Sequence, residues 1–273
     1  MSQIGVVSNV ATDHLTAVVS DRIELEEVPT RLGVFARTVA DRALVDIDYL
    51  DAAVRAEREG VDAVFVNTFA DYNLAAMKSA LDIPVVGAGE STMHTASMLG
   101  ERFAIVTVWP QSMRHIYRDL LRDYRMEDRC EAIVHASPED ELDRLGTDKD
   151  VKEQMKESNE AVIDRLAEAC RTALDHGADT IVLGCTCMAP VAEELNARSG
   201  AQVLCPSRTG LVTTETLLRL GLTPSEVAYS TPQMSDADRI MALVDDAASR
   251  FPDDGSLNSG ECEICAISPK DGE

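Results

Sequence analysis

An internal repeat limits the folds open to this chain more than any other feature of its sequence. Residues 60–68 (GVDAVFVNT) are echoed by residues 177–185 (GADTIVLGC). In both copies a helical pattern ends on glycine, an aspartate follows after one intervening residue, and an apolar run leads to a small polar residue. Glycine suits the end of a helix because it accepts the left-handed backbone conformation. The repeat therefore predicts a duplicated structural unit.

The repeat extends to neighbouring segments, and with them it predicts the fold class. Residues 84–87 match 202–205, and residues 5–8 parallel 104–107. Apolar runs typical of buried strands lie at residues 4–8, 63–66, 85–86, 103–108, 133–134, 180–183 and 203–204. Helical patterns lie between them, at residues 49–59, 74–81, 111–124, 151–176 and 191–197. This alternation predicts an α/β protein in which two half-units, each a short parallel sheet flanked by helices, face each other across a cleft.

The polar residues that follow the predicted strands form the candidate site, because ligands of open parallel sheets bind at the carboxyl ends of the strands. One wall of the cleft is expected to carry Ser8, Asn9, Asn67, Thr68 and residues 87–92, and the other residues 107–109, Cys185, Thr186 and residues 205–209. The repeat puts Thr68 and Cys185 at equivalent positions on opposite walls. Asn67 and Thr68 can donate hydrogen bonds to a carboxylate or enolate. Thr68 is a poor base because its hydroxyl stays protonated near neutral pH.

Cys185 is the candidate catalytic residue. It follows a predicted strand and precedes a helix expected to begin near Pro190. The dipole and N–H groups of a helix N-terminus lower the pKa of a nearby thiol and so favour the thiolate. Gly184 allows a ligand to approach the backbone, and Thr186 offers a hydroxyl and an N–H. A buried structural cysteine is the competing interpretation. We apply that interpretation to Cys187, whose side chain need not point into the cleft.

The charge balance excludes one class of partner. Lys and Arg number 25 and Asp and Glu 48, a net charge of −23 at pH 7. This charge repels phosphate backbones, so no nucleic-acid partner is expected. We interpret the acidic residues as a solvated surface, as in proteins of a high-salt cytoplasm. No run of about 18 apolar residues predicts a membrane span, and the N-terminus lacks the basic segment of a signal peptide. A cytoplasmic location and no membrane partner are expected, and a homo-oligomer is left open.

The sequence also offers no cofactor motif. Residues 87–89 resemble the start of a dinucleotide fingerprint, but the third glycine is absent and Glu90 would repel a pyrophosphate. The five histidines show no metal-ligand spacing, and the seven cysteines predict no disulfide framework. Cys262 and Cys265 have metal-like spacing, but they stand alone in residues 251–273, which we expect to form a flexible acidic tail. We therefore expect no metal, nicotinamide or pyridoxal phosphate in the cleft.

Four segments carry a family resemblance: residues 68–74 (TFADYNL), 82–90 (DIPVVGAGE), 102–107 (RFAIVT) and 183–186 (LGCT). Together they resemble the hydantoin racemase branch of the aspartate/glutamate/hydantoin racemase superfamily, over about residues 4–245. The resemblance implies two lobes related by a pseudo-twofold axis, with a cofactor-independent active site between them. We place the first lobe at residues 1–97 plus 210–250 and the second at 98–209. The resemblance also implies that Asn9 faces the cleft.

In that family two cysteines flank the stereocentre of the substrate as opposing acid and base. The second corresponds to Cys185, whereas the first falls on Thr68 or, in another alignment, on Val66, so one thiol is missing. The resemblance implies a racemase or isomerase that acts on the carbon next to a carboxylate or cyclic-amide carbonyl of a small molecule, with Cys185 as acid and base. The implied substrate-binding residues are Asn9, Asn67, Thr68, Thr107 and Thr186.

The missing thiol leaves other activities open. Arylmalonate decarboxylase resembles these racemases but keeps only the second cysteine, which protonates one face of an enediolate after CO2 leaves. A decarboxylase of that kind is the main alternative, and cis–trans isomerisation is also compatible with the residues. A non-catalytic small-molecule binding protein is a third alternative. If another group supplies the second base of a racemase, Asp71 and Cys205 are the nearest candidates.

Overall fold

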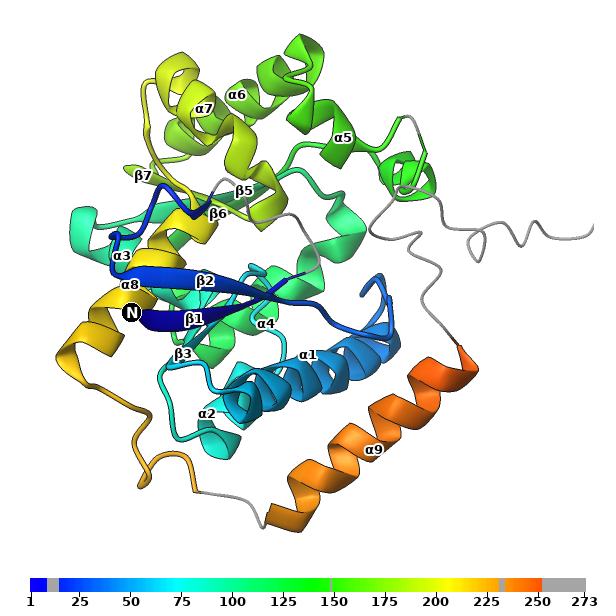
Figure 1. The fold of residues 1–273 in the computed structure, drawn as a ribbon. Helices are drawn as coiled ribbons and strands as arrows, with labels where there is room; N and C mark the ends of the chain where they lie inside the picture. Colours follow the sequence, from blue (N-terminus) through cyan, green and yellow to red (C-terminus); the bar gives the residue numbers. More distant parts are fainter. Residues whose placement is uncertain (9–14, 148, 231–233, 252–273) are drawn as a thin grey trace, which may run out of the picture.

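The computed structural model describes residues 1–8, 15–147, 149–230 and 234–251. It contains two parallel four-stranded sheets with helices packed against them (Figure 1). The first sheet has the order β2-β1-β3-β4, with β2 at Ile23–Val28, β1 at Ser2–Val7, β3 at Ala63–Val66 and β4 at Val85–Gly87. The second has the order β6-β5-β7-β8, with β6 at Cys130–His135, β5 at Phe103–Thr107, β7 at Thr180–Leu183 and β8 at Gln202–Leu204. The predicted fold class is confirmed.

The two sheets share local devices as well as strand order. Gly60 and Gly177, which precede the third strand of each copy, have positive φ angles of 102° and 101°. The Asp62 carboxylate accepts a hydrogen bond of 2.8 Å from the N–H of Gln3. The Asp179 carboxylate likewise accepts one of 3.0 Å from the N–H of Arg102. In both copies the repeated aspartate thus fastens the beginning of the third strand to the beginning of the central strand, which explains why it recurs.

The α-helices are α1 (Val39–Glu59), α2 (Leu74–Ala80), α3 (Ala88–Leu99), α4 (Arg114–Asp123), α5 (Val151–Lys156), α6 (Glu160–Asp175), α7 (Ala192–Ser199), α8 (Pro206–Leu220) and α9 (Met234–Arg250). Short 3-10 helices are η2 (Gln111–Met113), η3 (Glu127–Arg129), η4 (Glu139–Arg144) and η5 (Thr186–Val191). α8 packs on α3, β3 and β4, and α9 lies along α1 (Figure 1). The division into lobes, with 1–97 plus 210–250 in the first, stays a prediction, and α8 begins at Pro206, within the range placed in the second lobe.

Several elements differ from the predicted ones, and α3 was not among the predicted helical patterns. β2 was not predicted, because its sequence, IELEEV, is half charged and it lies at the edge of its sheet. The helix predicted over residues 151–176 is divided into α5 and α6, because Ser158 has a positive φ of 55° and Asn159 caps the second helix through its side chain. The helix predicted from residue 49 begins ten residues earlier, where Thr38 and Asp41 form a capping box.

Burial follows the predicted strands. Every residue of β3, β5 and β7 is buried, as expected for strands covered on both faces. These strands therefore hold their carboxyl ends, and the loops that follow them, in fixed positions. Among the described residues, no helix is long and apolar enough to cross a membrane. The predicted tail and its Cys262–Cys265 pair lie outside the described residues.

Candidate active site

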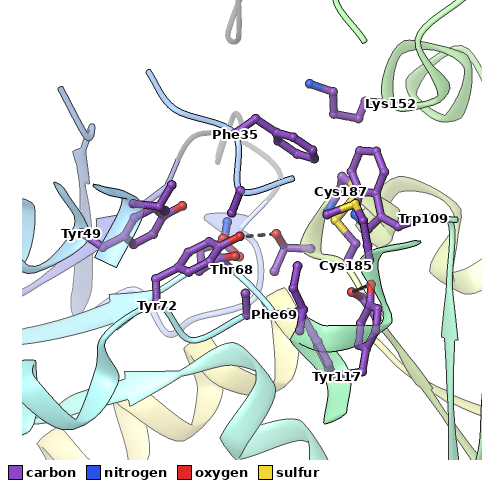
Figure 2. A pocket seen from close by; sticks show the side chains of 18 of the residues that line it. Phe35, Tyr49, Thr68, Phe69, Tyr72, Trp109, Tyr117, Lys152, Cys185 and Cys187 are labelled. Carbon is purple, nitrogen blue, oxygen red and sulfur yellow. Dashed lines mark hydrogen bonds between the residues drawn. A yellow bond between two sulfur atoms is a disulfide. The ribbon is translucent and has the colours of Figure 1, made fainter. Parts of the chain in front are cut away.

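A pocket lies between the two sheets, at the carboxyl ends of the central strands. The loop after β3 supplies Thr68 to the pocket, and the loop after β7 supplies Cys185. Figure 2 shows these two side chains on opposite sides, as the repeat predicted. The loop before α1 and residues 109–117 complete the walls. Asn9, which we predicted to face this cleft, lies outside the described residues.

Cys185 ends an extended stretch of backbone, with φ −153° and ψ 140°, and the 3-10 helix η5 begins at the next residue. The N–H of Cys187 donates a hydrogen bond of 3.3 Å to the Cys185 Sγ. Such a donor stabilises a thiolate. We expected helical N–H groups near this sulfur, from a helix that begins near Pro190. The structure has such groups in η5, which begins four residues earlier, at Thr186.

The interpretation of Cys187 as a residue remote from the cleft is wrong. Its side chain lines the same pocket, and its sulfur forms a disulfide with that of Cys185 (Figure 2). The physical reason is the tight turn into η5, which places both side chains on the same side of the loop. Cys185 can act as an acid or base only after this disulfide is reduced.

Thr68 lines the opposite wall, where its hydroxyl forms a hydrogen bond with that of Tyr49. Burial raises the pKa of Tyr49 well above its ordinary value, so its hydroxyl stays protonated. No Asp, Glu or His is among the described residues that line the pocket. The Thr68 wall therefore offers hydroxyl groups but no carboxylate or imidazole base.

Asn67 and Thr186 also line the pocket, and they connect its two walls. The Thr186 hydroxyl donates 3.2 Å to the backbone oxygen of Asn67. The Asn67 side chain accepts from Ser207 Oγ at 2.8 Å and donates to Ser8 Oγ at 3.2 Å. The Asn67 amide nitrogen carries a second hydrogen, which these bonds leave for a ligand. Both predicted residues are thus in the pocket, with part of their bonding capacity used by the protein itself.

Thr107 does not line the pocket, so its predicted contact with the substrate is not supported. It is fully buried, and its hydroxyl contacts that of Tyr117 and accepts the N–H of Trp109 at 3.2 Å. The Tyr117 hydroxyl in turn donates 3.1 Å to the carbonyl of Gly184. A Cβ on Gly184 would lie 2.8 Å from that of Thr107. Thr107 and Gly184 therefore hold the Cys185 loop in place through close packing.

Asp71 and Cys205, the two residues considered as a second base, both lie outside the pocket that Cys185 lines. Asp71 is buried, and its carboxylate accepts the N–H groups of Gly89 at 2.9 Å and Glu90 at 2.6 Å, and the Tyr124 hydroxyl at 2.9 Å. Burial raises the pKa of Asp71 to about 7. It lines a separate cavity, and Cys205 is buried outside the Cys185 pocket. Asp71 caps the N-terminus of α3, and so fills the position that a phosphate would take at a helix N-terminus.

Sequence reasoning missed the aromatic character of the pocket. The chain has five Phe, five Tyr and one Trp. Six of these eleven side chains line the pocket: Phe35, Tyr49, Phe69, Tyr72, Trp109 and Tyr117. Two pairs join the walls, Phe35 with Trp109 at 5.3 Å between ring centroids and Phe69 with Tyr117 at 5.9 Å. Phe69 and Trp109 lie within three residues of the ends of β3 and β5, and this position was the signal that could have identified these two.

Lys152 was also missed. It comes from α5 and is the one cationic side chain among the described residues that line the pocket. Its Nζ lies 3.4 Å from the buried carboxylate of Asp150. Figure 2 shows it at the end of the pocket beyond Phe35 and Trp109. Within the described ranges, no group of three or more His, Cys, Asp or Glu side chains could hold a metal ion.

The chain thus has two parallel sheets with a pocket between them that Cys185 lines. Comparison with known proteins identifies its family. The Asp/Glu/hydantoin racemase family model matches residues 9–214. The chain therefore belongs to the Asp/Glu/hydantoin racemase family, as its motifs indicated. It is 31% identical over 195 residues to the hydantoin racemase of Paenarthrobacter aurescens. The aligned residues cover 70% of this chain and 77% of that protein.

Solved structures agree with this assignment. Allantoin racemase from Klebsiella pneumoniae superimposes with a TM-score of 0.74 and 25% identity, over 85% of this chain and 94% of that one. A crystal structure of arylmalonate decarboxylase superimposes with a TM-score of 0.53 and 18% identity, over 79% and 92%. The second likeness concerns the fold alone. The family relationship supports an isomerase as the class of enzyme.

Proposed function

We propose that this enzyme racemises or epimerises a stereocentre next to the carbonyl of a small cyclic amide of the hydantoin type, with the reduced thiol of Cys185 as acid and base. The observation that carries the proposal is the position of Cys185 in the pocket between the lobes of a chain related to hydantoin racemases. The proposal needs no cofactor, because the carbonyl groups of the substrate themselves stabilise the carbanion.

The chemistry begins with the Cys185 thiolate, which the N–H of Cys187 supports by its hydrogen bond. The thiolate takes the proton from the α-carbon, and the electron pair moves onto the neighbouring carbonyl to give an enolate. Preorganised donors stabilise such an oxyanion. Asn67, through its second amide hydrogen, and Thr68 are the donors that we assign to this oxygen. The thiol then exchanges its proton with solvent, and protonation of the enolate by Cys185 on the same face gives α-proton exchange with retention of configuration.

Inversion requires a proton on the other face. The Thr68 wall carries hydroxyl groups whose pKa values lie far above that of a thiol, so proton delivery there is slower than at Cys185. Solvent water that reaches the pocket through its opening is the proton source that we assign to this face. Cys185 thus acts on one face of the substrate, and inversion is the slower event.

The remaining walls define the substituent that the substrate carries. Six aromatic side chains favour an apolar or aromatic group on the α-carbon. The Lys152 ammonium at the end of the pocket is placed for a carbonyl or carboxylate oxygen of the substrate. This anchor fixes the orientation in which the α-carbon meets Cys185.

The test is a screen of optically pure 5-monosubstituted hydantoins with reduced enzyme, followed by polarimetry. Loss of rotation is expected for 5-benzylhydantoin, and the Cys185→Ala variant should lower the rate by about 10²–10⁴-fold, the usual contribution of an acid–base group. Cys130→Ser, which alters a thiol outside the pocket, is the matched control and should stay active. Loss of rotation at the same enzyme-dependent rate with Cys185→Ala would contradict the proposal.

One observation favours a second candidate, a decarboxylase. Thiols on one side only, those of reduced Cys185 and Cys187, face a wall without Asp, Glu or His among the described residues. This arrangement suits protonation of one face of an enediolate after CO2 has left into an apolar space. Release of CO2 from a disubstituted malonate, with one enantiomer as product, would establish this activity in place of racemisation. Ligand-induced thermal stabilisation without turnover of hydantoins, amino acids or malonates would instead indicate a binding protein.

A further inference from the structure

The loop after β7 brings two cysteines together at the pocket. The Cα atoms of Cys185 and Cys187 lie 5.3 Å apart, within the range of about 4.4–6.8 Å in which disulfides form. Residues two apart in a regular strand are separated by about 6.6 Å. The turn from β7 into η5 therefore closes the distance, and the sulfur atoms are bonded in this structure (Figure 2).

We propose that Cys185 and Cys187 form a reversible redox site, whose disulfide switches the enzyme off by removing the acid–base thiol. The inference rests on the proposed function, since it takes Cys185 as the group that moves the proton. Both side chains are half-buried and line the pocket. A small oxidant that enters the pocket as the substrate does can therefore reach either sulfur.

The chemistry balances with hydrogen peroxide as the oxidant. The Cys185 thiolate attacks one peroxide oxygen, the O–O bond breaks, and sulfenic acid and hydroxide form. The Cys187 sulfur then attacks the sulfenic sulfur, its S–H proton leaves with the hydroxyl group as water, and the S–S bond forms. In total two thiols lose two protons and two electrons, and peroxide becomes two water molecules. A dithiol such as dithiothreitol reverses the change by exchange.

The other described cysteines are unlike this pair. Cys130, Cys170 and Cys205 are free thiols, and none of them lines the pocket. Burial raises the pKa of Cys130 and of Cys170 to about 12, which keeps them protonated and slow to react. Cys187 has a thiol neighbour two residues away and a backbone N–H that contacts the sulfur of that neighbour. Oxidation is therefore expected at Cys185 and Cys187 before the buried thiols.

The sequence permits a direct measurement on the full chain. Cleavage after Arg171 and Arg198 gives one tryptic peptide, residues 172–198, that contains Cys185 and Cys187 and no other cysteine. Reduced, desalted protein is treated with hydrogen peroxide, alkylated and digested with trypsin. The mass of the peptide is then measured by mass spectrometry. The oxidised peptide should carry no alkyl group and be lighter than the dithiol by two hydrogen atoms, and dithiothreitol should restore two alkylation sites. Turnover of the active hydantoin is measured on the same samples.

Two variants separate the pair from general oxidation. For wild type and for Cys130→Ser, peroxide should lower the rate by about tenfold or more, and dithiothreitol should restore it. For Cys187→Ser, compared with its own reduced activity, the loss should become progressively irreversible. Without a neighbouring thiol, the Cys185 sulfenic acid proceeds to sulfinic acid, which dithiothreitol does not reduce.

The outcomes distinguish this inference from the proposed function. A peptide that stays a dithiol while buried cysteines oxidise would overturn the redox site, and so would fully reversible loss in Cys187→Ser. A disulfide that forms and is reduced in a protein inactive on every hydantoin would leave the redox site standing and overturn the proposed function. A peptide that oxidises with no change in turnover would contradict the proposal that the disulfide controls Cys185.

Discussion

Thr68 and Cys185 face each other because they follow equivalent strands, yet they differ in what they can do with a proton. A thiol, the group that reduced Cys185 carries, is by nature a much stronger acid than a hydroxyl, whereas the hydroxyl of Thr68 is held by Tyr49 and stays protonated. This asymmetry makes the two faces of a bound substrate unequal. It also makes position 68 the residue at which the reaction can be altered most simply.

Thr68→Cys should speed up proton delivery to the face of the substrate that lies opposite Cys185. A second thiol opposite Cys185 supplies the missing acid and base, so the rate of racemisation relative to α-proton exchange should rise on the order of tenfold. Polarimetry and NMR on one sample give both rates. Thr68→Ser, which keeps the hydroxyl, is the control and should leave the ratio near that of wild type. An unchanged ratio in Thr68→Cys would show that proton delivery at this wall does not limit inversion.

At the scale of elements, two buried hydrogen-bond groups hold the strand-end loops. The hydroxyls of Thr107 and Tyr117 connect β5 and α4 to the carbonyl of Gly184, next to Cys185. The Asp71 carboxylate fixes the start of α3 and, through Tyr124, ties it to α4. Tyr117 lines the Cys185 pocket, but neither group has a reacting role in the proposed mechanism, so their loss should affect position and stability first.

Tyr117→Phe should remove the hydroxyl that donates to the Gly184 carbonyl and that contacts the Thr107 hydroxyl. The free energy of unfolding is expected to fall by about 1–3 kcal/mol, the cost of an unsatisfied buried group, and urea denaturation measures it. Turnover should fall as well, because the Cys185 loop loses its support. Tyr229→Phe alters a tyrosine outside that pocket and should be near neutral. A fully stable Tyr117→Phe would contradict the role assigned to this hydroxyl.

Asp71 should make stability depend on pH. Because burial raises its pKa to about 7 in the folded protein, the folded state holds a proton that the unfolded state releases near pH 4. Its contribution is fully present at low pH and is lost as the pH rises toward about 7. Asp71→Asn cannot titrate, so its unfolding free energy should change less than that of wild type between about pH 5 and pH 8, by on the order of a few kcal/mol. Equal pH dependence in both proteins would refute this.

The sequence was sufficient to predict elements with a strong local pattern. It was insufficient where residues distant along the chain determine the local structure. The apolar runs of β3, β5 and β7 predicted those strands, because burial on both faces requires continuous apolar residues. β2 was missed because an edge strand tolerates the charges of Ile23–Val28. Asp71 seemed close to Thr68 along the chain, but its positive φ of 45° turns the backbone, and the carboxylate lies against Gly89 instead.

At the scale of the whole molecule, the sequence predicted the duplicated sheets and the cleft between them, but not the side chains that line it. The family and the cleft followed from the repeat and the strand-end motifs, since both are written into local sequence. The aromatic lining did not, because Phe35 and Trp109 meet only after the two lobes have packed. The disulfide was missed for a similar reason: whether Cys187 points into the pocket depends on the turn into η5.

The net charge of −23 predicts a salt dependence of stability. Repulsion among acidic side chains opposes the compact state, and salt screens it, with a Debye length that falls from about 10 Å at 0.1 M to about 3 Å at 1 M. The Tm should therefore rise when NaCl is raised between these concentrations. Calorimetry or thermal fluorescence measures the shift. A Tm that falls over this range would mean that the attractive ion pairs outweigh the repulsion.

The measurement that tests the account most directly compares α-proton exchange with racemisation in D2O. Reduced enzyme is mixed with one enantiomer of the active hydantoin, deuterium at the α-carbon is followed by NMR, and configuration by polarimetry. One thiol facing Thr68 predicts exchange that is severalfold faster than inversion, after correction for the spontaneous reaction, and Cys185→Ala should lose both. Equal rates of exchange and inversion in wild type would mean that a second base serves the other face, and would contradict the one-thiol mechanism.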